Sequence, residues 1–449
     1  FSMVLLETGI IIVAALLLMA LIMLNFRDFV EDTVVVKLST LLAPERIWVP
    51  LSVVLLLFIV GGVLPGRLFA RIPVSQVFRR YTEGKKGWKR PLLFVQFAGV
   101  AFISGLMCVV MSQYQYVLKK DMGYNPKQIA IGNAYWDNEA TRDAAYQFFK
   151  GLPYVEAVSS ANSTPISGYS GSMIHSESGQ ALFSCRSSYF MREDFPALMG
   201  MTMKTGRMAR DKEEVVVNET FAEMMRWGDD VVGRTVYTEG NTFKVVGQLK
   251  DFQIESFRTE KMPFIARGNK NFYGTVHVRL KEPFTENLQK LNHDVAEAFH
   301  DQTIDFTGYE KRIENSYNSV RVFRNATLMA AVTMFFIMLM GLIGYTTDEV
   351  RRRSKEIAIR KVNGAEASGI LEMLSRDILV VAAPAVVIGT VLAWYVNGMW
   401  MEQFAERIPV SWAVYVLVVM ANLVIIVACV LWKSWRIANE NPVNSIKSE

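Results

Sequence analysis

Six apolar stretches, each long enough to cross a membrane as a helix, constrain this chain more than any other feature. They are Val4 to Leu24, Ile47 to Leu64, Pro91 to Met111, Thr327 to Thr347, Ile378 to Val396 and Trp412 to Leu431. About 20 helical residues at 1.5 Å each span the ~30 Å hydrocarbon core of a bilayer. The second stretch is the shortest and contains Gly61, Gly62 and Pro65. The sequence predicts a membrane α-helical bundle with six transmembrane helices.

Basic residues at the ends of the apolar stretches predict the orientation of the helices. The loop between the second and third stretches contains eight Lys or Arg residues against Glu83 alone, which places it in the cytoplasm. The loop after the first stretch has more acidic than basic residues and is expected outside. Counting onward, the region from Ser112 to Asn325 is external, the loop from Glu349 is cytoplasmic and Asn397 to Ser411 is external.

The long external region mixes strand and helix patterns and predicts an inserted α+β extracytoplasmic domain. Expected strands are Gln128 to Gly132, Val155 to Ser160, Glu214 to Val217 and Thr275 to Leu280, with a hairpin from Thr235 to Gly247 across Glu239-Gly240-Asn241. Expected helices are Asn138 to Leu152, a segment capped by Asn218 with Phe221 and Met224 packing inward, and Thr285 to His300. The spacing in Tyr309 to Asn325 predicts a stalk helix that continues into the fourth apolar stretch. An ordinary juxtamembrane helix is the alternative.

The cytoplasmic stretch from Glu349 to Leu371 combines a basic cluster with a helical ion pair. Its basic residues are Arg351, Arg352, Arg353, Lys355, Arg360 and Lys361. Glu356 precedes Arg360 by four residues, the favoured order for a helical pair, and Gly364 and Gly369 interrupt or cap the helix. This pattern predicts two short helices at the membrane surface. A plain positive-inside loop would explain the charge alone.

The order of residues in RRSKEIAIRKVNGA resembles the cytoplasmic loop of FtsX/MacB-type ABC transporter permeases. That resemblance implies a coupling helix that docks on an ATPase subunit. It implies that the following residues form an ATPase-coupling loop: Arg353, Lys355, Glu356, Ile357, Ile359, Arg360, Lys361, Gly364 and Ala365. Asp121, Gly123, Tyr124 and Asn125 fit the same family's D-x-G-Y/F-N signature. Several segments between Ser188 and Phe252 resemble its periplasmic domain, whereas the resemblance is weak from Trp136 to Arg186, which we expect to vary with substrate or partner.

Two segments of the chain resemble each other at a constant offset of 369 residues. LETGIIIVAAL aligns with SRDILVVAAPA, and ARIPVSQVF with NENPVNSIK. We therefore expect a tandem-repeat permease that lacks its N-terminal portion here and has eight spans in full. In chain order, the sequence predicts a transmembrane helix pair (1–80), a cytoplasmic linker with the third transmembrane helix (81–111), an extracytoplasmic MacB-like periplasmic domain (112–308), a stalk helix (309–326) and an FtsX-like domain with three transmembrane helices and the coupling loop (327–449).

The sequence contains none of the motifs that support catalysis or cofactor binding. It has no G-x-x-x-x-G-K-[ST] phosphate loop, no H-E-x-x-H, no G-x-S-x-G and no C-x-x-C. The four histidines share no metal-ligand spacing, and the lone external cysteine, Cys185, is expected to be a small buried residue. We predict no catalytic, cofactor-binding or metal site, and no enzyme activity in this chain. ATP and Mg would be bound by the partner ATPase.

The resemblance implies a permease subunit in a bacterial inner membrane, coupled to a separate P-loop ABC ATPase. The motion would serve export, lipoprotein release or mechanotransmission to a periplasmic or envelope partner. The alternative is a membrane receptor or scaffold without an ATPase, which links an external ligand domain to a cytosolic partner. Nucleic acid is a poor partner because each basic cluster flanks a membrane span.

Overall fold

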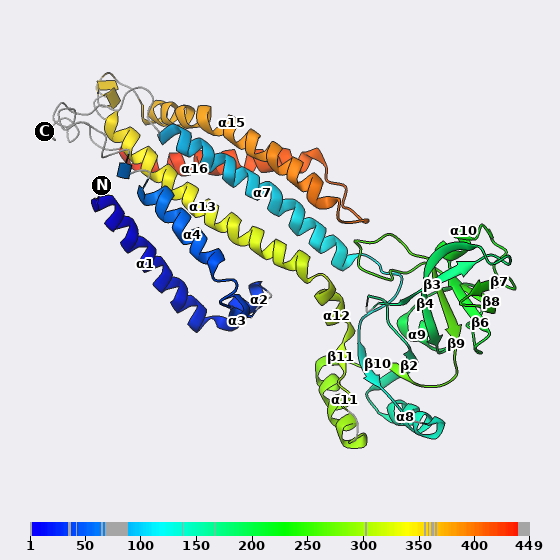
Figure 1. Ribbon diagram of the computed structural model, residues 1–449. Coiled ribbons are helices and arrows are strands. Elements are labelled where there is room, and N and C mark those ends of the chain that lie inside the picture. The colour runs from blue at the N-terminus through cyan, green and yellow to red at the C-terminus, as the bar shows by residue number, and fades with distance from the viewer. Residues whose placement is uncertain are drawn as a thin grey trace. The chain divides into compact units, whose positions relative to one another are not determined.

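The structure is a computed structural model. It describes residues 2–34, 37–41, 43–63, 66–67, 89–136, 138–166, 168–300, 303–353, 356–357, 359–360, 363 and 366–438. The chain divides into two compact units (Figure 1). The membrane unit comprises Phe1–Met111, Val320–Met399 and Pro409–Glu449, and the periplasmic unit comprises Ser112–Ser319 and Trp400–Ile408.

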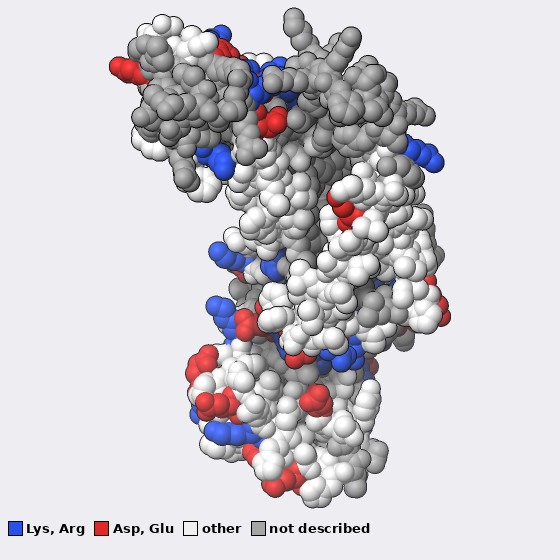
Figure 2. All heavy atoms as spheres, turned by 90° about the vertical axis from the view of Figure 1, so that its left-hand side faces the viewer, with Lys and Arg blue, Asp and Glu red and all other residues white. Residues whose placement is uncertain are grey.

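The membrane unit consists of helices. In chain order they are α1 (Ser2–Asn25), α2 (Arg27–Val34), α3 (Leu38–Leu41), α4 (Trp48–Phe58), the π-helical turn η1 (Ile59–Val63), α7 (Lys89–Lys119), α13 (Asn318–Arg352), α15 (Ala367–Met401) and α16 (Trp412–Ala438). Of these, α1, α7, α13, α15 and α16 are long and apolar enough to cross a membrane. Large parts of this surface carry no Lys, Arg, Asp or Glu (Figure 2).

The predicted membrane bundle is confirmed, and the second of the six expected spans is an apolar helix over its described residues. Its described helix runs from Trp48 to Val63, and it changes from α-helix to π-helix at Ile59. Gly61 and Gly62 lie in the π-helical turn, where their weak helix propensity permits the change of winding. The structure therefore describes five helices of spanning length and one shorter apolar helix.

Small residues let the membrane helices approach closely. A core cluster joins α7, α13, α15 and α16 through Phe97, Met338, Ile378 and Ile426. Gly389 of α15 faces the backbone of α7 so closely that a Cβ atom there would lie 2.1 Å from the carbonyl oxygen of Ala98. Lipid tails provide little hydrophobic drive between helices, so such close contact is a main source of their association.

The periplasmic unit is built on a sheet that folds partly into a barrel. Its strands are β1 (Ile129–Ala134), β2 (Val155–Ala161), β3 (Ser170–His175), β4 (Ala181–Met191), β5 (Met203–Gly206), β6 (Glu214–Asn218), β7 (Thr235–Thr238), β8 (Asn241–Leu249), β9 (Phe264–Gly268), β10 (Gly274–Leu280) and β11 (Thr307–Gly308). The order β11-β1-β10-β2-β4 forms the smaller sheet. The order β4-β3-β7-β8-β6-β9 returns to β4 and closes a six-stranded barrel.

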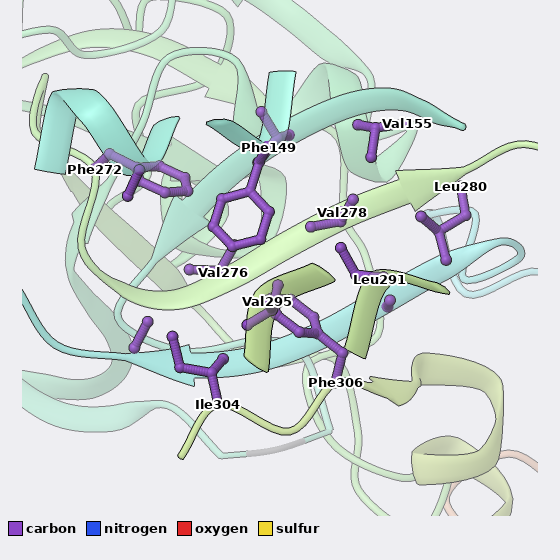
Figure 3. Close-up of a cluster of buried hydrophobic side chains, with 14 of the residues drawn as sticks. Phe149, Val155, Phe272, Val276, Val278, Leu280, Leu291, Val295, Ile304 and Phe306 are labelled. Atoms are coloured by element: carbon purple, nitrogen blue, oxygen red, sulfur yellow. The ribbon is translucent and has the colours of Figure 1, made fainter. Parts of the chain in front are cut away.

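Each part of the periplasmic unit has its own core. Helices α8 (Glu139–Gly151) and α11 (Phe284–Ala298) pack on the smaller sheet and bury Phe149 and Leu291 against Val276 and Phe306 (Figure 3). The barrel encloses a second cluster that includes Cys185, which is 2% exposed. The prediction that Cys185 is a small buried residue is confirmed.

Most of the elements expected in this unit are present. Helix α8 is capped by Asn138, the first residue of the expected helix, whose side chain accepts a hydrogen bond from the Thr141 amide. The hairpin turns at Glu239 and Gly240, both with positive φ, as a tight two-residue turn requires. Helix α10 (Glu219–Met224) is capped by Asn218 and buries Phe221, but Met224 is 46% exposed. The expected inward packing of Met224 is wrong because this six-residue helix presents only one side to the barrel core.

The expected continuous stalk is interrupted. Helix α12 (Tyr309–Ser316) ends at Tyr317, and α13 begins at Asn318. Tyr317 is almost fully buried, and its hydroxyl accepts a hydrogen bond from the Phe257 amide. The break follows from a tertiary contact that helical spacing cannot reveal.

Candidate functional site

The cytoplasmic end of α13 is tied to α15 by one arginine. The Arg353 guanidinium places Nε 2.6 Å from Oε1 of Glu349 and Nη2 2.7 Å from Oδ2 of Asp377. Arg352 reaches the same Glu349 oxygen at 2.7 Å. The Glu349 side chain is 8% exposed, so the two cations compensate a largely desolvated carboxylate. Asp377 lies on α15, and Arg353 therefore holds two helices at the start of the predicted coupling loop.

An apolar contact anchors the same loop. Ile357 is 5% exposed and packs with Val350 of α13 and with Ile370 and Leu374 of α15. Its amide donates a hydrogen bond to the carbonyl of Arg353, a helical contact. Burial of an isoleucine side chain contributes about 1.5–3 kcal/mol. The loop is thus fixed to both helices by an ionic contact and an apolar one.

The remaining described residues of the loop point away from this anchor. Ile359 is 61% exposed, and Glu356 forms an exposed ion pair with Arg360 at 2.7 Å. The predicted pairing of Glu356 with Arg360 is confirmed. Four members of the predicted loop, namely Lys355, Lys361, Gly364 and Ala365, lie outside the described residues. An exposed isoleucine beside two exposed charges is a surface on which another protein can dock.

Sequence reasoning missed the role of Asp377 in this anchor. Asp377 lies immediately before the fifth apolar stretch, beside Arg376, and that neighbour is an apparent local explanation for its charge. The partner that the structure shows is Arg353, 24 positions earlier in the chain. A basic residue just after one span and an acidic residue just before the next was the available signal, since the short loop brings those ends together.

A second polar cluster lies in the periplasmic unit. We call it the junction cluster and define it as Gln113, Lys120, Phe257, Arg258, Tyr317, Phe404 and Glu406. The Phe257 amide donates to the Tyr317 hydroxyl at 3.0 Å, and the Phe257 carbonyl accepts from the Glu406 amide at 3.3 Å. Burial raises the pKa of Tyr317 to about 12, so the hydroxyl stays protonated.

Helix α7 enters the junction cluster through Gln113, which is fully buried. Its Nε2 donates to the Glu406 carbonyl at 2.9 Å, and its Oε1 accepts from the Ile408 amide at 3.0 Å. Lys120 forms an ion pair with the Glu406 carboxylate. The loop at Phe257 therefore meets three segments that are distant in sequence. They are the C-terminal part of α7, the end of α12, and the connection between α15 and α16.

Comparison with known families identifies the two parts of the chain. The FtsX-like permease C-terminal model matches residues 326–442, and the MacB-like periplasmic core domain model matches residues 97–291. The chain is an FtsX-like permease with a MacB-like periplasmic core domain. The resemblance found in the sequence is confirmed, and this permease is a multi-pass membrane protein with a periplasmic domain.

Similar proteins support the same assignment for this FtsX/MacB-type permease. The macrolide export ATP-binding/permease protein MacB of Aggregatibacter actinomycetemcomitans is 21% identical over 365 residues, which cover 74% of this chain and 54% of that protein. The permease spans about half the length of this curated relative and matches its permease part.

Two solved structures are similar to part of this chain. The periplasmic region of MacB from Actinobacillus actinomycetemcomitans covers 45% of this chain and 99% of its own, at 13% identity and a TM-score of 0.33. The extracellular domain of the noncanonic ABC-type transporter YknZ from Gram-positive bacteria covers 40% of this chain and 98% of its own, at 12% identity and a TM-score of 0.29.

Proposed function

We propose that this chain is a permease subunit in a bacterial inner membrane and couples ATP hydrolysis by a separate ABC ATPase to movement of its periplasmic domain. The observation that carries the proposal is the anchored loop after α13. Arg353 and Ile357 fix that loop to α13 and α15, while Glu356, Ile359 and Arg360 stay exposed. A force applied to the exposed residues would therefore act on both helices.

The chemistry of the loop suits a protein surface with an apolar pocket and acidic neighbours. Ile359 would enter the pocket, and the basic residues of the loop that do not belong to the Glu349 anchor, Arg360 among them, would favour an acidic rim. In this proposal ATP and Mg are bound by the partner, and the residues of this chain only bind the ATPase and transmit its movement.

Helices α7 and α13 are the elements through which movement would pass. Each is one continuous helix whose residues belong to both units. In the periplasmic unit, Gln113 of α7 and Tyr317, immediately before α13, are both buried in the junction cluster. The spans contain few ionisable residues, which favours mechanotransmission over conduction of a polar solute. Export and lipoprotein release would use the same movement.

The test is a charge reversal on the exposed side of the loop. The protein, purified from its native membrane in mild detergent with its bound partners, is assayed for ATP hydrolysis with Arg360→Glu and, separately, Ile359→Glu. Both variants should recover less ATPase and show several-fold lower hydrolysis per permease. The matched control is Arg234→Glu, because Arg234 also forms an exposed ion pair with a carboxylate four positions away, Asp230, in the periplasmic unit.

Two results would contradict the proposal. One is full ATPase recovery and unchanged hydrolysis with both loop variants. The other is recovery of signalling or envelope proteins without any P-loop ATPase from the unmodified protein. That second outcome would favour a receptor or scaffold.

A further inference from the structure

An open cavity of about 510 Å³ lies in the periplasmic unit, and none of its lining residues belongs to the coupling loop or to the junction cluster. We call it the Arg312 cavity. Its lining comes from five separate places in the sequence: β1 and the residues after it, the loop at Asn162 to Thr164, β4, the start of β10, and α12. A cavity of this size holds a small organic molecule or a few residues of peptide.

One wall of the Arg312 cavity is aromatic and rigid. The rings of Phe190 and Tyr273 lie with their centroids 3.9 Å apart. The Tyr273 hydroxyl accepts a hydrogen bond from Asn269 Nδ2 at 2.7 Å, which fixes the ring. Gly274 follows with φ +82°, and a Cβ atom there would lie 2.6 Å from Phe190 Cζ. The chain thus has a glycine where a larger residue would displace the aromatic wall.

The lining of the cavity carries positive charge and no negative charge among its described residues. Arg312 is the single charged residue among the described residues that line it, and none of them is Asp or Glu. Its Nε donates to the Thr307 hydroxyl at 2.9 Å, which orients the guanidinium. Within the described part of the chain, its two Nη atoms have no hydrogen-bond or ion-pair partner. Two such donors in one plane match the geometry of a carboxylate.

Neutral polar groups complete the cavity. The Thr164 hydroxyl lies 2.9 Å from Nε2 of His277, which is fully buried. Burial lowers the pKa of His277 to about 3, so the ring is neutral at pH 7. Asn133 accepts a hydrogen bond from the Thr275 hydroxyl at 3.2 Å. These groups can donate or accept hydrogen bonds without compensating the charge of Arg312.

We propose that the Arg312 cavity binds a carboxylate carried by an aromatic or other large apolar group. The guanidinium would hold the carboxylate through two hydrogen bonds, and the apolar group would lie on the Phe190–Tyr273 wall. The C-terminal residue of a peptide and a small aromatic acid share this chemistry. A cationic molecule does not fit, because it would meet an uncompensated guanidinium. Part of the lining, Asn162 to Thr164, belongs to the region in which the sequence resembles the family least.

The test compares ligands that differ only in charge, on full-length protein in detergent without ATP. Isothermal titration uses N-acetylphenylalanine and its uncharged carboxamide, then Gly-Gly-Phe and its C-terminal amide. Each acid should bind saturably and about tenfold or more tightly than its amide, since a charge-assisted bidentate contact is lost in the amide. Tighter binding of the tripeptide identifies a peptide terminus as the ligand, and tighter binding of the acetylated amino acid identifies a small aromatic acid.

Variants assign the preference to Arg312. Arg312→Gln should reduce binding of the acid to that of the amide, and Arg312→Lys should retain part of the preference through its charge. Arg234→Gln, an exposed arginine on the same unit, is the control and should bind as the unmodified protein does. The proposal is overturned if acid and amide bind equally, if Arg312→Gln keeps the preference, or if no ligand binds saturably. The acid and amide comparison on unmodified protein remains decisive should a variant fold poorly, and none of these outcomes depends on an ATPase.

Discussion

The Arg353 guanidinium lies 2.7 Å from the Asp377 carboxylate, and this ion pair joins the end of α13 to the first third of α15. The same guanidinium holds Glu349, whose side chain is nearly buried. One cation thus serves two carboxylates on two helices. Removing the Arg353 guanidinium would remove the ion pair between α13 and α15. Among the described residues, Glu349 would then keep Arg352 as its one ion-pair partner.

The first prediction concerns this shared cation. Arg353→Gln should destabilise the membrane unit by about 1–3 kcal/mol, because a largely buried carboxylate loses a charged donor. Arg360→Gln is the control, since its pair with Glu356 is exposed and worth no more than about 0.5 kcal/mol. Thermal unfolding in detergent measures both. Equal melting temperatures for the two variants would show that Arg353 does not stabilise the bundle.

A second prediction concerns the junction cluster. Tyr317→Phe keeps the ring but removes the acceptor of the Phe257 amide, which is buried. The loss of this acceptor should destabilise the periplasmic unit by about 1–3 kcal/mol and speed hydrogen exchange at that amide. Tyr237→Phe, on strand β7, is the control. Unchanged exchange at Phe257 in the Tyr317 variant would argue that the contact is unimportant for local stability.

The third prediction is a pH dependence that arises from His277. Its folded pKa is lowered to about 3 by burial, against 6.5 for an exposed histidine. Between these values the unfolded chain binds a proton that the folded chain excludes, so stability is complete above pH 6.5 and falls as the pH is lowered. The loss should reach roughly 2 kcal/mol at pH 5.

His277→Gln isolates this contribution, because glutamine can hydrogen-bond Thr164 but does not titrate. Denaturant unfolding of the unmodified protein and the variant at pH 7 and pH 5 measures the difference. The variant should lose less stability between the two pH values. Arg207 lowers the pKa of Glu214 from 4.5 to about 2, so the stability that this carboxylate contributes is lost only below about pH 4.5. Both proteins contain Glu214, so it does not affect the comparison. Parallel losses in the two proteins would contradict the assignment to His277.

The fourth prediction tests the close approach of two membrane helices. Gly389→Ala places a methyl group against the Ala98 carbonyl and should destabilise the bundle by about 1–3 kcal/mol through overpacking. Gly398 lies on the same helix, and a Cβ atom added there would have no described atom within 4 Å, so Gly398→Ala should be neutral or stabilising. Opposite shifts in melting temperature are expected. Two equal shifts would exclude packing at Gly389 as the cause.

Local sequence patterns predicted the helices and strands that are marked by apolar periodicity, a capping residue or a turn motif within the element itself. The apolar stretches, the Asn218 cap and the Glu239-Gly240 turn depend on residues near one another in the chain, and each is present. The expected strands did not include β3, β4, β5, β9 or β11. The pairing of β3, β4 and β9 with one another and with β6 and β7 closes the barrel, and that pairing depends on contacts between distant residues.

The contacts of the candidate site also fall into local ones, which the sequence predicted, and long-range ones, which it did not. The pair of Glu356 with Arg360 is local and was predicted, whereas Arg353 with Asp377, Phe257 with Tyr317, and the whole Arg312 cavity join residues far apart in sequence. The sequence identified Arg353 through its family pattern. It could not supply the partner of Arg353, because side-chain contacts between helices follow from tertiary packing.

The closed barrel also limits how a partner protein can bind the periplasmic unit. Each of its six strands has a neighbour on both sides. Among the described strands, the free edges are β11, which has two residues, and β5, which has four and pairs only with β8. A partner that extends a sheet by adding its own strand needs a free edge several residues long. An envelope protein would therefore have to recognise side chains and loops, so surface substitutions rather than backbone mimics are the means to disrupt such a complex.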